Sequence, residues 1–168
     1  MTDASNQMTR EGYNQLTEEL NYRSGEKRKE IGERLKEAIS YGDISENSEY
    51  DAAKEAQAEN EDRIKEIEAT LRTAQVVDEE EGLEEGTVQT GRYVAIRDVK
   101  YDEIMVYQIV GNTEADPFKG KLSNMSLVGQ HLIGHKEGEE LDFEVPEGMA
   151  KYQILKVSNE KLDEADFQ

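Results

Sequence analysis

From Met8 to Asp78 the chain contains no proline, and mostly apolar residues recur at every third or fourth position. The positions between them are mainly Glu, Lys, Arg, Ala and Gln, which favour helix. The pattern is most regular in the second half of this stretch, where spacings of three and four alternate: Tyr50, Ala53, Gln57, Asn60, Ile64, Ile67, Leu71 and Ala74. This alternation is the heptad pattern of a coiled coil.

A turn signal divides the helical stretch into two helices. Gly42 predicts the end of the first helix, and Asp43 predicts the start of the second. The first helix carries a looser stripe of the same kind between Tyr13 and Ala38. Two helices of roughly 32 residues follow, each about 48 Å long at 1.5 Å per residue.

The two stripes match if the chain folds back at the turn. Their apolar ends then face one another, and the polar middle of the first stripe, at Ser24 and Lys27, meets Asn60 in the second. A seam that is polar in the middle on both helices favours an antiparallel arrangement over one continuous helix or a parallel dimer. We therefore predict an antiparallel coiled-coil hairpin over residues 8–78, with its tip at 40–47.

The second half of the chain has a different pattern. Residues 79–86 are mainly acidic with two glycines, which is typical of a linker. Short β-rich runs bounded by Gly and Asp follow, together with one helical segment near Ser126–Ile133; the runs are Arg92–Val99, Ile104–Val110, Leu141–Val145 and Tyr152–Val157. We predict a small α+β domain over 87–157, with flexible ends at 1–7 and 158–168.

The amino-acid composition limits the classes of molecule that the protein can bind. The 168 residues include 20 Lys plus Arg and 39 Asp plus Glu, a formal net charge of −19. Such an anionic surface repels phosphate, so free duplex nucleic acid and anionic membranes are poor partners. Cysteine is absent, which excludes disulfides, thiolate nucleophiles and sulfur-liganded zinc. With no apolar run approaching the roughly 20 residues of a membrane span and no secretory signal, we expect a cytoplasmic protein.

Two acids at the predicted tip are the first candidates for chemistry. Asp43 and Glu46 have the spacing of a capping box, in which both side chains accept hydrogen bonds from helix-end amides. A carboxylate has about four acceptor sites, so a capping acid can also present oxygens to a hard cation. Holding two carboxylates about 45 Å from any core stabilises a fold poorly, but it suits a probe that enters a narrow site on a partner.

The tip and the helix after it, from Gly42 to Glu55, resemble the bacterial GreA/GreB transcript cleavage factors. The resemblance covers residues 8–157 in order, far more than a single motif. It continues through these further segments: Arg63–Glu68, Ala74–Asp78, Ile109–Gly111, Glu114–Asp116, Leu132–Gly134, Gly138–Glu139, Val145–Gly148 and Tyr152–Val157.

This resemblance implies an α+β fold with an N-terminal coiled-coil hairpin and an FKBP-like C-terminal domain. It also implies that the protein is no enzyme itself: it docks on RNA polymerase, and its hairpin enters the secondary channel. There the polymerase cleaves the extruded 3′ end of nascent RNA in a backtracked complex. Asp43 and Glu46 are then the catalytic carboxylates that help hold the second Mg²⁺, bound only within the polymerase active centre. We expect a monomer with no membrane partner and no small-molecule substrate of its own.

Further site candidates come from the same resemblance and, for Arg34 and Lys36, from the cluster of basic residues on the first helix. The candidates for RNA contact are Lys54, Arg34 and Lys36, although a solvated lysine or charge balance with nearby glutamates explains such residues as well. The candidates for docking on polymerase are Glu114, Asp116, Ser126 and Leu127. Family members usually have Pro at the position of Leu127 and a small residue at that of His131, so both depart from the pattern near the docking surface.

Four alternatives stay open. A channel-occupying inhibitor of the same fold blocks nucleotide entry without aiding cleavage, although inhibitory relatives have a more heavily acidic tip. In a structural coiled-coil adaptor, Asp43 and Glu46 only cap a helix. His131 and His135 have a spacing that can hold zinc, but no third ligand is evident and Gly134 predicts a helix end between them. Prolyl isomerase activity is disfavoured because few aromatic residues are available to line a pocket.

Overall fold

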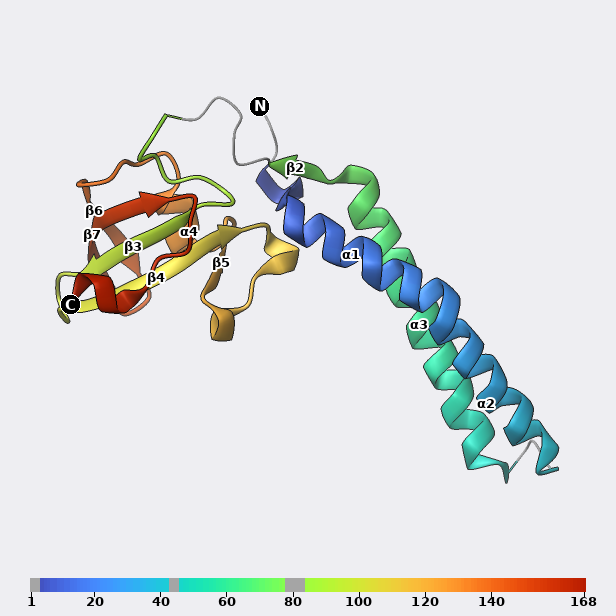
Figure 1. Cartoon of the computed structure of the whole chain (residues 1–168). Helices are drawn as coiled ribbons and strands as arrows, with labels where there is room; N and C mark the ends of the chain where they lie inside the picture. Colours follow the sequence, from blue (N-terminus) through green and yellow to red (C-terminus); the bar gives the residue numbers. More distant parts are fainter. Residues whose placement is uncertain (1–3, 43–45, 78–83) are drawn as a thin grey trace. The chain divides into compact units, whose positions relative to one another are not determined.

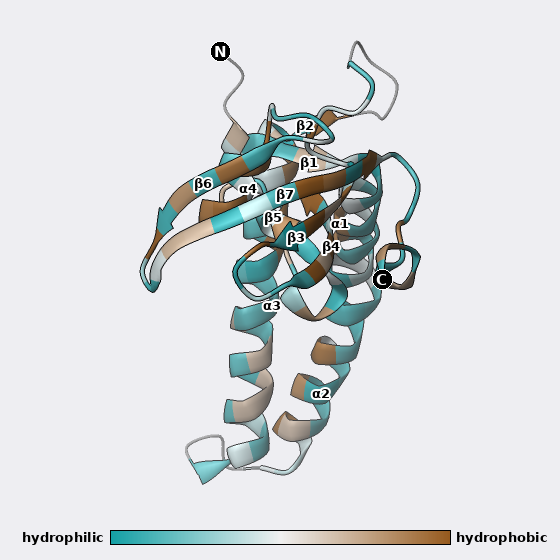
Figure 2. Cartoon of the chain, turned by 90° about the vertical axis from the view of Figure 1, so that its left-hand side faces the viewer, coloured by the Kyte–Doolittle hydropathy of each residue, from teal (hydrophilic) through white to brown (hydrophobic). Residues whose placement is uncertain are grey.

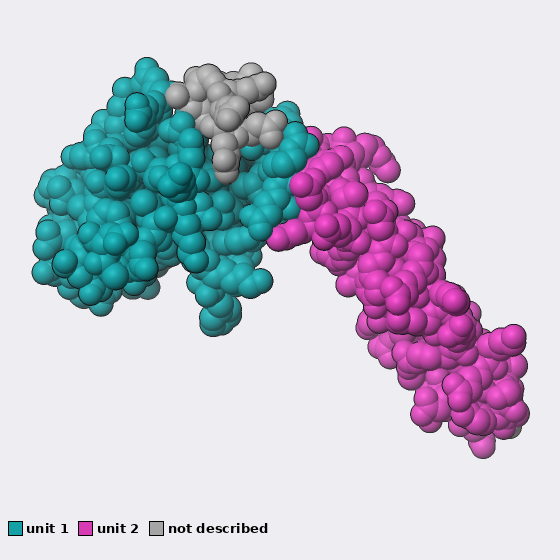
Figure 3. Space-filling model, viewed as in Figure 1, with its two compact units in different colours: residues 1–12, 75–168 teal, residues 13–74 magenta. Residues whose placement is uncertain are grey.

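The computed structural model describes residues 4–42, 46–77 and 84–168, and it divides into two units (Figure 3). The hairpin unit consists of residues 13–74. The globular unit combines residues 1–12 with 75–168. No helix among the described residues is long and apolar enough to cross a membrane.

Two antiparallel helical arms form the hairpin (Figure 1). The first arm runs through α1 (Arg10–Tyr22), a π-helical turn (Arg23–Lys27) and α2 (Arg28–Ser40). The second arm is α3 (Ser48–Thr73). The prediction of a helical hairpin is therefore confirmed, but α3 begins at Ser48 rather than at Asp43 and ends before Asp78.

Residues on the predicted seam lie between the arms. In α3 the side chains of Ala53, Asn60, Ile64 and Ile67 are buried, and Ile31 and Ala38 are buried on the first arm. The two arms face each other close to the predicted register. In agreement with it, the Asn47 side-chain amide donates to the main-chain oxygen of Ala38 at 2.6 Å, across the turn. Hydrophilic residues predominate along both arms (Figure 2).

Two short strands at the base of the hairpin were not predicted. β1 (Gln7–Thr9) pairs in parallel with β2 (Gln75–Val77), with Met8 opposite Val76. The prediction that the second helix runs to Asp78 is wrong at these residues, because Val76 and Val77 are β-branched and favour a strand once β1 is beside them. Both strands belong to the globular unit, and Met8 is buried there.

The largest sheet of the globular unit has five strands, in the order β5-β4-β3-β7-β6. Its strands are β3 (Tyr93–Asp98), β4 (Glu103–Val110), β5 (Lys121–Ser123), β6 (Glu140–Val145) and β7 (Gly148–Ser158). All neighbours are antiparallel except β4 and β5. The four predicted strands are confirmed, whereas three-residue β5 was not predicted.

One short helix packs its apolar side against the sheet. In α4 (Leu127–Leu132), Leu132 is fully buried and belongs to the same core as Val94, Ile96 and Ile154 of the sheet. The core also includes Phe143 of β6 and Ile109 of β4, and hydrophobic segments alternate with hydrophilic ones along the strands (Figure 2). This arrangement of a mixed sheet and a helix confirms the α+β fold class.

Regular structure also occurs in the ends that were predicted to be flexible. Ala4–Asn6 form a 3₁₀ turn, and the buried Asn124 side chain donates to the main-chain oxygen of Ala4 at 2.9 Å. Glu164–Phe167 form another 3₁₀ turn, which Asp163 caps by accepting from the Ala165 N–H. Both ends are polar in sequence and have no hydrophobic periodicity. The pattern of apolar residues therefore could not predict these hydrogen-bonded turns. Most of the predicted linker, 79–83, lies outside the described residues.

Candidate functional site: the hairpin tip

Asn47 organises the described part of the hairpin tip. Its side-chain oxygen accepts hydrogen bonds from the N–H groups of Glu49 and Tyr50, at 3.1 and 3.2 Å, as a helix N-cap does. Its amide also donates across the turn to Ala38. One side chain therefore both caps α3 and joins the two arms.

The alternative in which Asp43 caps the second helix does not hold for α3, whose N-cap is Asn47. This helix starts after Asn47, and among the described residues Glu46 has no hydrogen-bond or ion-pair partner. The Glu46 side chain is exposed. Asp43 lies outside the described residues. Because Asn47 provides the cap, the Glu46 carboxylate keeps its acceptor sites for a ligand.

An exposed aromatic residue follows the first arm, two positions before Asp43 in the sequence. Tyr41 is the C-cap residue that follows α2, and its side chain is 66% exposed. Its hydroxyl donates to Glu37 at 3.0 Å, and this bond to a carboxylate raises the pKa of Tyr41, which therefore stays neutral. Tyr41 and Arg34 line one hollow of about 490 Å³.

The candidates for RNA contact differ in their surroundings. Lys54 reaches Gln57 on its own helix at 3.4 Å, and Arg34 and Lys36 are exposed on α2. Arg28, by contrast, makes two bonds to Glu61 on the other arm, at 2.7 and 2.8 Å. Charge balance between the arms thus accounts for Arg28, and Arg34, Lys36 and Lys54 stay candidates.

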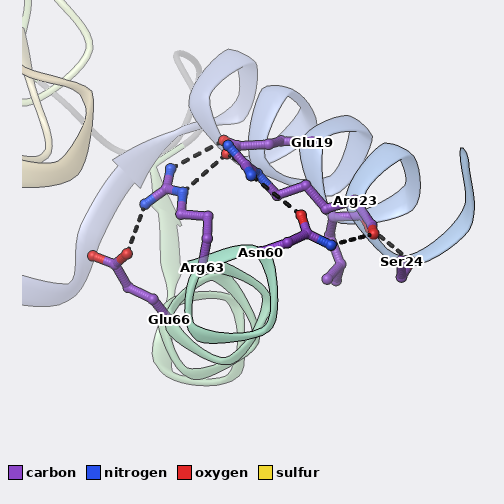
Figure 4. Close-up of polar contacts among 7 residues, drawn as sticks. Glu19, Arg23, Ser24, Asn60, Arg63 and Glu66 are labelled. Atoms are coloured by element: carbon purple, nitrogen blue, oxygen red, sulfur yellow. Dashed lines mark hydrogen bonds and ion pairs between the residues drawn. The ribbon is translucent and has the colours of Figure 1, made fainter. Parts of the chain in front are cut away.

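A polar network crosses the seam midway along the hairpin (Figure 4). The Glu19 carboxylate accepts two bonds from Arg63, at 2.9 and 3.0 Å, and one from Arg23 at 2.7 Å. These bonds lower the pKa of Glu19 to about 2, and Arg63 is the largest cause. Beside them, Asn60 donates to the main-chain oxygen of Arg23 at 3.0 Å and accepts from its guanidinium at 3.3 Å.

Three docking candidates make hydrogen bonds within the globular unit. Glu114 accepts from the N–H groups of Thr9 and Gly111, at 2.9 and 3.2 Å. Asp116 caps a 3₁₀ turn by accepting from the Phe118 N–H at 3.0 Å. Ser126 caps α4 by accepting from the Gly129 N–H at 3.0 Å. Glu114, with its carboxylate turned inward, is the poorest docking residue of the set.

Leu127, the fourth docking candidate, is the first residue of α4 and is 43% exposed. A proline suits this first helical position because its missing N–H needs no partner there, so Leu127 changes the surface and leaves the helix start intact. Phe118 is fully exposed, and Met125 is 39% exposed. Sequence reasoning missed both, because an apolar residue on a turn gives no sign of whether it faces the core.

The two histidines do not face a common ligand. The His131 ring stacks on Phe143, with 4.3 Å between ring centroids. His135 lies 2.9 Å from Glu139. Within the described part of the chain, no three His, Asp or Glu side chains are arranged to hold a metal ion.

Comparison with known families covers both units. A family model described as "Transcription elongation factor, N-terminal" matches residues 6–76, and one described as "Transcription elongation factor, GreA/GreB, C-term" matches residues 83–159. The chain belongs to the GreA/GreB family of transcription elongation factors. Apart from Val77 and Asp78, the segments that carry the resemblance lie inside the two matched ranges, and the sequence-based assignment is confirmed.

Individual relatives agree with the GreA/GreB assignment. Transcription elongation factor GreA of Alkaliphilus oremlandii is 47% identical over 158 residues, which is 94% of this chain and 99% of that one. GreA of Clostridioides difficile is 47% identical over 150 residues, 89% of this chain and 94% of that one. Among solved structures, GreA factor homolog 1 of Thermus thermophilus is 27% identical, covers 90% of this chain and 97% of its own, and superposes with a TM-score of 0.41.

Proposed function

We propose that this GreA/GreB factor enters the secondary channel of bacterial RNA polymerase with its hairpin and stimulates cleavage of the extruded RNA 3′ end in backtracked complexes. The polymerase performs the cleavage, and the factor supplies groups to its active centre. The single observation that carries the proposal is the exposed Glu46 carboxylate beside a helix whose cap is Asn47. This carboxylate lies at the end of the hairpin and makes no hydrogen bond or ion pair with the described residues. It is therefore available to bind another molecule.

The acids Asp43 and Glu46 fit a role in holding the second Mg²⁺. Oxygen atoms of carboxylates are preferred Mg²⁺ ligands, and one or two from a protein suffice when phosphates supply the rest. In phosphodiester hydrolysis, two such ions activate the attacking water and stabilise the leaving oxygen. Glu46 and Asp43 contribute negative oxygens, while polymerase acids and RNA phosphates complete the site.

The remaining surfaces have complementary roles in this proposal. Arg34, Lys36 and Lys54 lie on the helices next to the tip, where positive side chains attract RNA phosphates despite the acidic net charge. The globular unit docks on the polymerase through its exposed apolar side chains, Leu127 among them, with Asp116 and Ser126 shaping the turns that present them. A single copy of the chain carries all of these groups.

The test is a gel of 3′-labelled RNA from a backtracked polymerase complex, with and without the protein. The wild-type protein should shorten the RNA, whereas Asp43→Asn and Glu46→Gln should bind polymerase normally and lose most of this activity. Neither substitution should lower the melting temperature appreciably, because Asn47 keeps the cap. If the protein binds in the channel and slows RNA extension without cleavage, it is an inhibitor of the same fold.

A structural coiled-coil adaptor that takes no part in RNA cleavage predicts different results in these assays. In that case Asp43→Ala and Glu46→Ala change only thermal stability, and labelled RNA stays intact with every variant. Glu49→Gln serves as the matched control, since Glu49 is an exposed acid in the first turn of α3. Its cleavage activity should equal that of the wild type.

A further inference from the structure

Asn60 is the buried polar side chain among the described residues of the hairpin unit, with 2% of its surface exposed. It lies in the seam, with the apolar residues Ile64 and Ile67 beyond it on α3. Its oxygen and its nitrogen both contact Arg23, through the guanidinium and the main-chain carbonyl (Figure 4). A buried amide in an apolar seam is destabilising unless such partners are present.

The partner residue begins an irregular turn of the first arm. Arg23 is the first residue of the π-helical turn Arg23–Lys27, which separates α1 from α2. A π-turn changes the regular hydrogen-bond ladder and is found in few places, often at functional positions. Asn60 thus contacts a main-chain feature that occurs once along the described first arm, whereas apolar contacts of Ala, Ile and Leu can form in several registers.

The loop between the arms links their register to the tip. Residues 41–47 separate α2 from α3, and this stretch contains both tip acids. A slip of one arm by one helical turn, about 5 Å along the axis, must take residues from the loop or add residues to it. The position of Asp43 and Glu46 relative to the rest of the hairpin therefore depends on the register.

We propose that Asn60 is a positioning residue that fixes the axial register of the hairpin and thereby the place of the two tip acids. The register claim stands on the Asn60–Arg23 contacts alone. Its consequence for RNA cleavage rests on the proposed function. Polar residues buried in coiled coils act in this way by penalising every register in which they lose their partners.

Register can be measured directly because the chain has no cysteine to interfere with labelling. Spin labels at Glu33→Cys and Glu55→Cys, both exposed and on opposite arms, report the offset between the arms. Wild-type Asn60 should give one narrow distance distribution. Asn60→Leu should broaden it or add a second population, shifted by several ångströms. Gln57→Leu is the matched control: it removes another polar seam residue outside the Asn60–Arg23 contact and should keep the wild-type distribution.

A cleavage assay combined with thermal unfolding distinguishes an effect of Asn60 on the position of the tip acids from an effect on the stability of the fold. Asn60→Leu should reduce stimulated RNA cleavage at least fivefold without lowering the thermal midpoint, whereas Glu59→Gln, at the exposed neighbouring position on α3, should retain both. Should Asn60→Leu fail to fold by circular dichroism, Asn60→Ala takes its place in both measurements. A single unshifted distance for the Asn60 variant overturns the register claim. A shifted distance combined with no cleavage by the wild-type protein leaves the register claim intact and overturns the proposed function.

Discussion

Glu114 accepts hydrogen bonds from both the main-chain N–H and the hydroxyl of Thr9, a residue 105 positions earlier in the chain. The same carboxylate accepts from the Gly111 N–H. Thr9 in turn accepts from the Gly12 N–H at 3.0 Å and so caps the start of α1. Glu114 is therefore connected to the first turn of α1 by a chain of hydrogen bonds within the globular unit.

Removing this carboxylate should destabilise the protein. In Glu114→Ala the Thr9 and Gly111 donors lose their acceptor in a partly buried place, so we expect a loss of about 1–3 kcal/mol in the free energy of unfolding. Urea denaturation measures it. Glu144→Ala, which removes an exposed glutamate from β6, should change the value by less than about 0.5 kcal/mol. Equal midpoints for the two variants would show that the Thr9 contact contributes nothing.

A glycine beside the same carboxylate provides an independent check. A Cβ added at Gly12 would lie 2.0 Å from the Glu114 Oε1 atom, so Gly12→Ala must push the carboxylate away from Thr9. We expect this variant to be destabilised and its effect to be non-additive with Glu114→Ala in a double-mutant cycle. Gly32→Ala is the control, because Gly32 has open space around it on α2 and should gain about 0.5–1 kcal/mol.

The Glu19 network predicts a pH dependence of hairpin stability. Arg63, followed by Arg23, lowers the pKa of Glu19 from 4.5 to about 2, so the folded state holds this carboxylate ionised more strongly than the unfolded state does. The contribution of ionised Glu19 to the free energy of unfolding is complete above pH 4.5 and is lost as the pH falls toward 2. Because the site is partly solvated, we expect about 1–2 kcal/mol at neutral pH.

Chemical denaturation at several pH values tests the Glu19 prediction. Glu19→Gln should be less stable than the wild type at pH 7, and the difference should disappear by about pH 2. Glu18→Gln changes an exposed neighbour and should follow the wild type throughout. A difference between Glu19→Gln and the wild type that is constant with pH would contradict the assignment.

The hairpin could be predicted from the sequence because its signal is local and periodic. The heptad spacing from Tyr50 to Ala74 placed Ala53, Asn60, Ile64 and Ile67 correctly in the seam. The start of α3 could not be fixed in this way. Asp43 and Asn47 are equally good caps by residue type, and the bond that Asn47 makes to Ala38 across the turn has no signal in the sequence.

Contacts between distant segments limited the prediction of the globular unit. β1 and β5 have three residues each, too few for an alternating pattern, and each exists because a distant strand pairs with it. The inward direction of Glu114 likewise depends on Thr9, which no local pattern connects with it. The sequence could identify Glu114–Asp116 as part of the family pattern, but the distinction between a structural acid and a docking acid required the fold.

The central claim is that the tip carboxylates help hold a magnesium ion in the polymerase active centre. The most direct test is the Mg²⁺ concentration that gives half-maximal RNA cleavage in backtracked complexes. The wild-type protein should lower this concentration, and Asp43→Asn and Glu46→Gln should return it toward that of polymerase alone, by about tenfold. The Glu49→Gln control should behave as wild type. The claim is contradicted if both tip variants cleave with the wild-type Mg²⁺ dependence and rate.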